Sequence, residues 1–138
     1  PGSYDLRQII KNYESENWFT KVETQPREIF VNVVRNASAL IGNSSMGILE
    51  APFYKLPVVN VGNRQKGRLN AGNVNFVEHR DIKIIEALDN ACLNDNYRQK
   101  VLNIVNPFGD EKSAKNISNA IDCIDLSDKK WYIKRKLC

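Results

Sequence analysis

The chain has 138 residues, of which 42% are apolar and 26% are charged, and this is the composition of an ordinary globular domain with one core. Its net charge is +4, with much of the basic excess between residues 129 and 136, so the charge is too small and too local to indicate nucleic-acid binding. No apolar run approaches the length of a membrane span. These features exclude a membrane protein and a nucleic-acid-binding protein.

Three cysteines are present, an odd number without the spacing of a metal site. Cys92 and Cys123 fall on apolar helical faces, so we expect both to be buried thiols. This usage favours a reducing cytoplasm. We expect neither a metal nor a cofactor.

In chain order, apolar periodicity predicts a helix over about 4–15, a strand over 18–24 and a helix over 26–36 that opens at Pro26. A strand over 38–42 follows and stops at Gly42. Ser44 and Ser45 then form a turn, and a short helix begins that Pro52 limits.

Pro57 opens a strand over 58–61 that is nearly all apolar, as in a parallel strand buried on both faces. Residues 62–73 form a loop whose length usually indicates a function, and 74–77 form a short strand. Helices are predicted from about residue 81, over about 97–104, over 112–124 and over 127–138, where Trp131 would anchor a basic terminal helix.

The alternation of strands and helices indicates an α/β fold, with a Rossmann-like parallel sheet flanked by helices. Ligands of such sheets bind beyond the carboxyl ends of the strands. The Ser44–Ser45 turn and the 62–73 loop both follow strand ends. We therefore expect a ligand site there.

Residues 41–51, IGNSSMGILEA, carry the strongest chemical signal. Small polar residues before a helix can bind phosphate through free backbone N–H groups, and a carboxylate at Glu50 can accept hydrogen bonds from a ribose diol. Together these groups would bind a nucleotide. The same residues also suit an ordinary helix cap, and the local pattern alone favours the cap.

Three segments in order resemble the hydrolysing UDP-N-acetylglucosamine 2-epimerases of the NeuC-like branch. Residues 41–51 resemble the family's IGNSSxGxxEA segment, and residues 57–68, PVVNVGNRQKGR, resemble its PxxNxGxRQxGR segment. Residues 106–110, NPFGD, with Ser113 and Ala114, resemble its NP[YF]GDG signature, although Glu111 stands where a glycine is common.

The resemblance implies the C-terminal, nucleotide-binding half of a two-domain GT-B architecture, and we expect the chain to begin inside that half, as a single UDP-binding domain over 1–138. Ser44 and Ser45 would hold the UDP phosphates and Glu50 the ribose. Arg64, Gln65 and Arg68 would lie in a loop facing the cleft.

The implied reaction converts UDP-N-acetylglucosamine and water into N-acetylmannosamine and UDP, through UDP elimination and hydration of a 2-acetamidoglucal, in sialic-acid-type sugar synthesis. The family takes most of its acid and base carboxylates from the other domain. We therefore expect this chain alone to be inactive and its full-length parent to form a homo-oligomer, a dimer. Two alternatives stay open: the donor half of a GT-B glycosyltransferase, and a non-catalytic UDP-sugar-binding fragment.

Other candidates have ordinary structural explanations. His79 matches no catalytic histidine of the family and is expected on a surface loop. Asp110 and Glu111 suit the capping of the helix that follows them, and Trp18 suits a packing anchor. The asparagines of the 70–75 segment suit turns.

Overall fold

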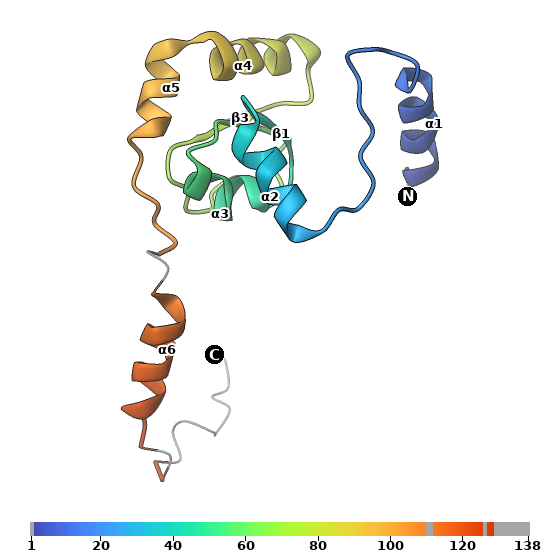
Figure 1. Ribbon diagram of the computed structural model, residues 1–138. Helices are drawn as coiled ribbons and strands as arrows, with labels where there is room; N and C mark the ends of the chain where they lie inside the picture. The colour runs from blue at the N-terminus through green and yellow to red at the C-terminus, as the bar shows by residue number, and fades with distance from the viewer. Residues whose placement is uncertain (1, 110–111, 126, 129–138) are drawn as a thin grey trace, which may run out of the picture.

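A three-stranded parallel sheet with helices around it forms the centre of the computed structural model, which describes residues 2–109, 112–125 and 127–128 (Figure 1). The strands lie in the order β1-β2-β3, with bounds Leu40–Gly42, Val58–Val61 and Val74–Val77. Leu40 pairs with Val58, and Val58 pairs with Val74. The predicted α/β class with a Rossmann-like parallel sheet is confirmed.

The helices are α1 (Ser3–Tyr13), α2 (Arg27–Asn36), α3 (Met46–Leu49), α4 (Asp81–Leu93), α5 (Asp95–Leu102) and α6 (Ser113–Asp122). A 3-10 turn, η1 (Ala51–Tyr54), follows α3, with Pro52 in its first turn. Proline lacks the N–H that an α-helix would need there, so α3 ends after one turn. Strands β2 and β3 are joined by the 62–73 loop, which contains no helix.

Strand β2 is buried on both faces, as its apolar sequence predicts. Successive side chains of a strand point to opposite faces. Val58 therefore packs with Val34, Ala51 and Leu56 on the side of α2 and η1. Val59 packs with Ala87 and Ala91 of α4 on the other side.

Asn73, which directly precedes β3, connects several elements. Its side chain is fully buried, and its Nδ2 donates to the carbonyl of Gly47 at 3.3 Å and to that of Leu56 at 3.0 Å. Its own carbonyl accepts the Tyr97 hydroxyl at 3.1 Å and the Val58 N–H at 2.9 Å. Burial raises the pKa of Tyr97, so its phenol stays protonated and remains a donor.

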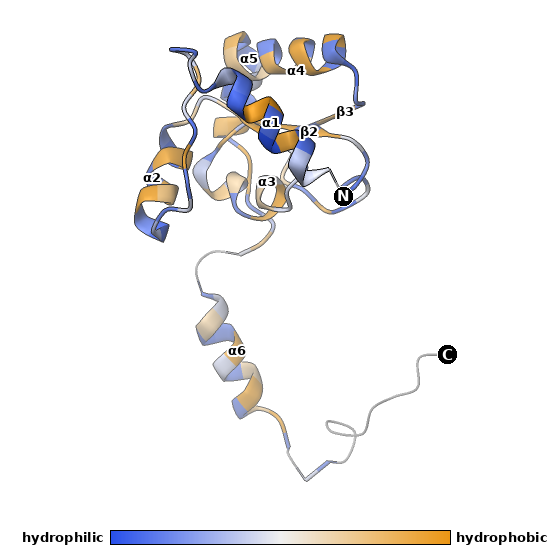
Figure 2. Ribbon diagram, turned by 90° about the vertical axis from the view of Figure 1, so that its right-hand side faces the viewer, coloured by the Kyte–Doolittle hydropathy of each residue, from blue (hydrophilic) through white to orange (hydrophobic). Residues whose placement is uncertain are grey.

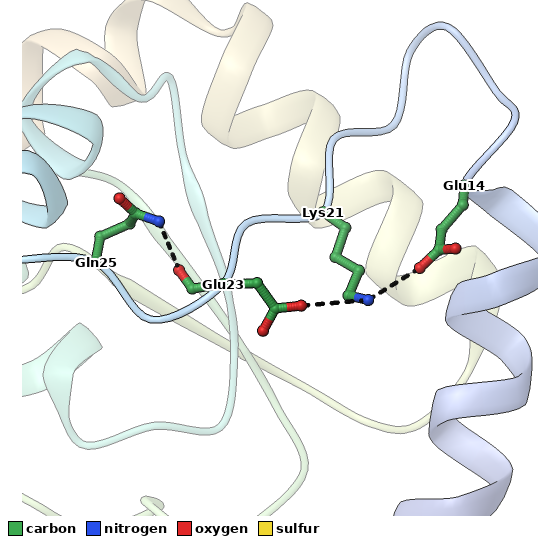
Figure 3. A network of polar contacts seen from close by, with 4 residues as sticks. All are labelled: Glu14, Lys21, Glu23 and Gln25. Carbon is green, nitrogen blue, oxygen red and sulfur yellow. Dashed lines mark hydrogen bonds and ion pairs between the residues drawn. The ribbon is translucent and has the colours of Figure 1, made fainter.

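The strand predicted over 18–24 is wrong. These residues run without regular structure and are mostly exposed, and the Trp18 ring contacts the rings of Tyr13 and Phe19 nearby in the chain. A strand exists through its hydrogen bonds to a neighbour, and in the described residues β1 pairs only with β2. In this segment Lys21 forms exposed ion pairs with Glu14 at 3.0 Å and with Glu23 at 3.3 Å (Figure 3).

Helices α1 and α6 bury no side chain, and α6 projects beyond the sheet and its helices in both views (Figures 1 and 2). Apolar residues remain on their surfaces, including Leu6, Ile9, Ile117 and Ile121. Cys123, predicted to be buried, is exposed because α6, at whose C-terminal end it lies, buries none of its residues, and Cys92 is half-buried.

The helix predicted over 127–138 lies outside the described residues, apart from residues 127–128, which form a turn and a bend. The capping predicted for Asp110 and Glu111 also lies outside them. No helix in the described part of the chain is long and apolar enough to cross a bilayer.

Candidate nucleotide site at the carboxyl end of the sheet

The turn after β1 contains Ser44 and Ser45. The Oγ of Ser44 accepts the N–H of Met46 at 3.3 Å, which is a local serine turn, and Ser44 is exposed while Ser45 is half-buried. Helix α3 has four residues, so its dipole is small. The helix-start argument for phosphate binding is therefore weaker than the sequence suggests, and the N-cap residue of α3, Ser45, makes no capping hydrogen bond with its side chain.

Glu50 follows α3 and pairs with Arg27 at the start of α2, with 2.7 Å between Oε2 and Nη2. The carboxylate raises the pKa of Arg27 through this hydrogen bond, so the guanidinium stays charged. The Glu50 side chain is 39% exposed, and its Oε1 makes no ion pair among the described residues.

A pocket of about 280 Å³ brings Glu50 and Arg27 together with Asn106, Phe108 and Gly109. Asn106 orders this segment, since its Oδ1 accepts the N–H of Phe108 at 3.0 Å. Residues from the 41–51 and 106–110 segments, more than fifty positions apart, therefore line one cavity.

The 62–73 loop contacts the segment that follows β1. Gln65 is 3% exposed, and its Nε2 donates to the carbonyl of Asn43 at 3.1 Å. Arg68 is exposed and donates to Oε1 of Gln65 at 2.8 Å. Arg64 is also exposed and has no ion pair or side-chain hydrogen bond within the described ranges. The loop thus contacts Asn43, the residue that precedes Ser44 and Ser45.

His79 follows β3 and is exposed, as expected of a surface-loop residue. It also lies against Gly62 at the end of β2, where a Cβ would come within 2.9 Å of its Cε1. Gly62, Lys66, Phe76 and His79 line a second pocket of about 410 Å³. The sequence gives no signal for this contact beyond a glycine at a strand end.

Arg27 is a residue of the site that the sequence analysis missed. It pairs with a carboxylate 23 positions away, and no local spacing indicates that pair. A basic residue in the first turn of a helix interacts unfavourably with the helix dipole. This mismatch is the feature of the sequence that indicates a tertiary partner for Arg27.

The strands and loops together define a Rossmann-like α/β unit with polar loops at the carboxyl ends of its strands. The profile of the UDP-N-acetylglucosamine 2-epimerase family matches residues 2–122. The chain belongs to this family.

Three curated relatives of the chain are named as 2-epimerases. The chain is 38% identical over 82 residues to the GDP/UDP-N,N'-diacetylbacillosamine 2-epimerase (hydrolyzing) of Campylobacter jejuni, over 56% of this chain and 21% of that protein. It is 31% identical to the UDP-N-acetylglucosamine 2-epimerase of Neisseria meningitidis, over 66% of this chain and 24% of that protein. It is 30% identical to the UDP-N,N'-diacetylbacillosamine 2-epimerase (hydrolyzing) of Legionella pneumophila, over 91% of this chain and 32% of that protein. The matches thus span a fifth to a third of these relatives.

Proposed function

We propose that this chain is the C-terminal, UDP-binding part of a hydrolysing UDP-N-acetylhexosamine 2-epimerase with a GT-B architecture. The observation that supports the proposal is that the 41–51 segment contacts both of the other segments: Glu50 shares a pocket with Asn106 and Phe108, and the Asn43 carbonyl accepts a hydrogen bond from Gln65. Family membership supports the epimerase rather than a glycosyltransferase.

In the proposed site the Ser44 and Ser45 hydroxyls and the arginines of the 62–73 loop bind the diphosphate of UDP. Glu50 accepts hydrogen bonds from the ribose hydroxyls, and Arg27 holds its carboxylate in place. Cations and hydroxyls at the diphosphate stabilise the negative charge that develops when UDP leaves. The chain thus binds the leaving group of the reaction.

The proposed reaction of the parent protein has two steps. Removal of the C2 proton accompanies cleavage of the bond between C1 and the UDP oxygen, which yields a 2-acetamidoglucal and UDP. Water then adds across the double bond with the opposite configuration at C2, giving the 2-epimeric sugar. The relatives' names point to either N-acetylglucosamine or a diacetamido sugar as the substrate.

Replacing Glu50 by alanine should lower UDP affinity at least tenfold, because the ribose loses a charged acceptor worth about 1.5–3 kcal/mol. Calorimetry with UDP and with 2′-deoxy-UDP measures this, and the preference for UDP should fall together with the affinity. Glu28→Ala is the matched control, since Glu28 is an exposed carboxylate on α2. An unchanged UDP affinity in Glu50→Ala would show that the ribose assignment is wrong.

The chain by itself should release no UDP from UDP-N-acetylglucosamine. Proton removal at C2 needs a base and reprotonation needs an acid. Glu50 is the one carboxylate among the described residues lining its pocket, and it is paired with Arg27. A coupled assay for free UDP, run beside UDP-binding calorimetry on the same sample, tests this expectation. Release above the rate of the buffer blank would contradict it.

A further inference from the structure

Gln65 is a buried residue in the exposed basic part of the 62–73 loop. Its neighbours Arg64, Lys66 and Arg68 are exposed, whereas Gln65 is 3% exposed. Burying a side-chain amide costs free energy unless its polar atoms find partners. Both polar atoms of Gln65 have protein partners, so the residue is held in one orientation.

The two hydrogen bonds fix which way the amide faces. Nε2 donates to the carbonyl of Asn43 at 3.1 Å, and Oε1 accepts from Nη1 of Arg68 at 2.8 Å. In the reversed orientation an oxygen would face a carbonyl and an NH₂ group would face a guanidinium, and both contacts repel. Backbone bonds from Lys66 to Asn63 and from Arg68 to Gln65 fold the loop back so that Arg68 reaches this amide.

We propose that Gln65 is a positioning residue that holds the Arg68 guanidinium beside the Asn43–Ser45 turn, so that Arg68 meets a diphosphate there. The inference rests on the proposed function as a UDP site. The Gln65 amide lies between Arg68 and the Asn43 carbonyl. The Arg68 guanidinium keeps its other N–H groups for a ligand, since its side chain makes no second hydrogen bond to the described residues. Gln65 itself contacts no ligand in this arrangement.

The experiment compares Gln65→Met, Gln65→Glu and Arg68→Ala in the full chain. Methionine fills the same volume but makes neither hydrogen bond, and glutamate loses the donor to Asn43 and neutralises Arg68. Gln99→Ala is the matched control, because Gln99 is an exposed glutamine on α5 whose side chain makes no hydrogen bond within the described ranges. Calorimetry measures UDP, and NMR titration measures uridine and inorganic pyrophosphate. Thermal melting confirms that each variant is folded.

The expected result is a roughly tenfold loss of UDP affinity in Gln65→Met, with a larger loss in Gln65→Glu and no change in Gln99→Ala. Pyrophosphate binding should weaken in parallel and uridine binding should not, because positioning acts only on the diphosphate. In the double variant with Arg68→Ala, the loss should equal that of Arg68→Ala alone, since Gln65 acts through Arg68.

The outcomes separate the two proposals. If the wild-type chain binds UDP and Gln65→Met binds it equally well, the positioning role is overturned and the proposed function stands. If the wild type binds pyrophosphate but UDP no more tightly, and Gln65→Met weakens pyrophosphate, the positioning role stands and the nucleotide function fails. If the wild type binds neither probe, both are overturned. A loss of uridine binding equal to that of UDP also overturns the positioning role.

Discussion

Replacing Asn73 by leucine is expected to lower the free energy of unfolding by about 2–3 kcal/mol, although Asn73 lies in a loop. The substitution leaves the buried carbonyls of Gly47 and Leu56 without the Nδ2 donor that they share. Each unsatisfied buried group costs about 1–3 kcal/mol. Part of the loss is offset, because Oδ1 of Asn73 is buried without a partner among the described residues and leucine removes that atom.

Urea unfolding measures the effect on Asn73→Leu. Asn96→Ala is the control, since Asn96 is exposed on α5 and should change stability by less than about 0.5 kcal/mol. Asn73→Asp gives a second measure, because aspartate keeps the volume but turns a donor into an acceptor facing two carbonyls, and it should be at least as destabilising. An Asn73→Leu midpoint equal to that of the wild type would mean that these bonds do not stabilise the fold.

Gly62→Ala is expected to cost about 2–3 kcal/mol, from two separable causes. The backbone at Gly62 has φ of +86°, where a Cβ costs about 1–2 kcal/mol. The added Cβ would also collide with the His79 ring, which must move. Because this site ends β2 and lines the 410 Å³ pocket, the shift also reshapes that pocket.

Gly72→Ala provides the matched control for the backbone cost. Its φ is +89°, and a Cβ there meets no atom within 4 Å. The difference between the two variants therefore measures the collision with His79, and Gly62→Ala combined with His79→Ala should recover it. Equal destabilisation by Gly62→Ala and Gly72→Ala would show that the His79 contact has no energetic weight.

The sheet could be predicted because the burial of a strand is reflected in its residue types. Residues 58–61 are nearly all apolar because β2 packs against side chains on both of its faces. Strand β3 pairs with β2 along its whole length. Residues 18–24 have strand-forming side chains too, but pairing is a property of two segments, and β1 pairs only with β2 among the described residues. The residue pattern of the 18–24 segment cannot by itself indicate whether a partner strand exists.

The location of the candidate site could also be predicted in part. The turn at Ser44 and the loop at 62–73 follow strand ends, and this placement follows from topology alone. The contacts that each side chain makes do not follow from topology. Gln65 and Arg68 stand in one basic loop, yet one is buried between segments and the other is exposed. Asn73 suits a turn by residue type, but in the structure its side chain donates a hydrogen bond to the carbonyl of Gly47 in α3 and so connects two elements.

Helices α1 and α6 bear on how any denaturation of this chain should be interpreted. The urea dependence of the unfolding free energy, the m-value, scales with the surface that unfolding exposes. Helices that bury no side chain contribute little to that surface, and short isolated helices are marginal in water. The m-value of this chain therefore reports chiefly the sheet with α2, α4 and α5, and a value below that of a compact protein of equal length indicates two peripheral helices rather than an unfolding intermediate.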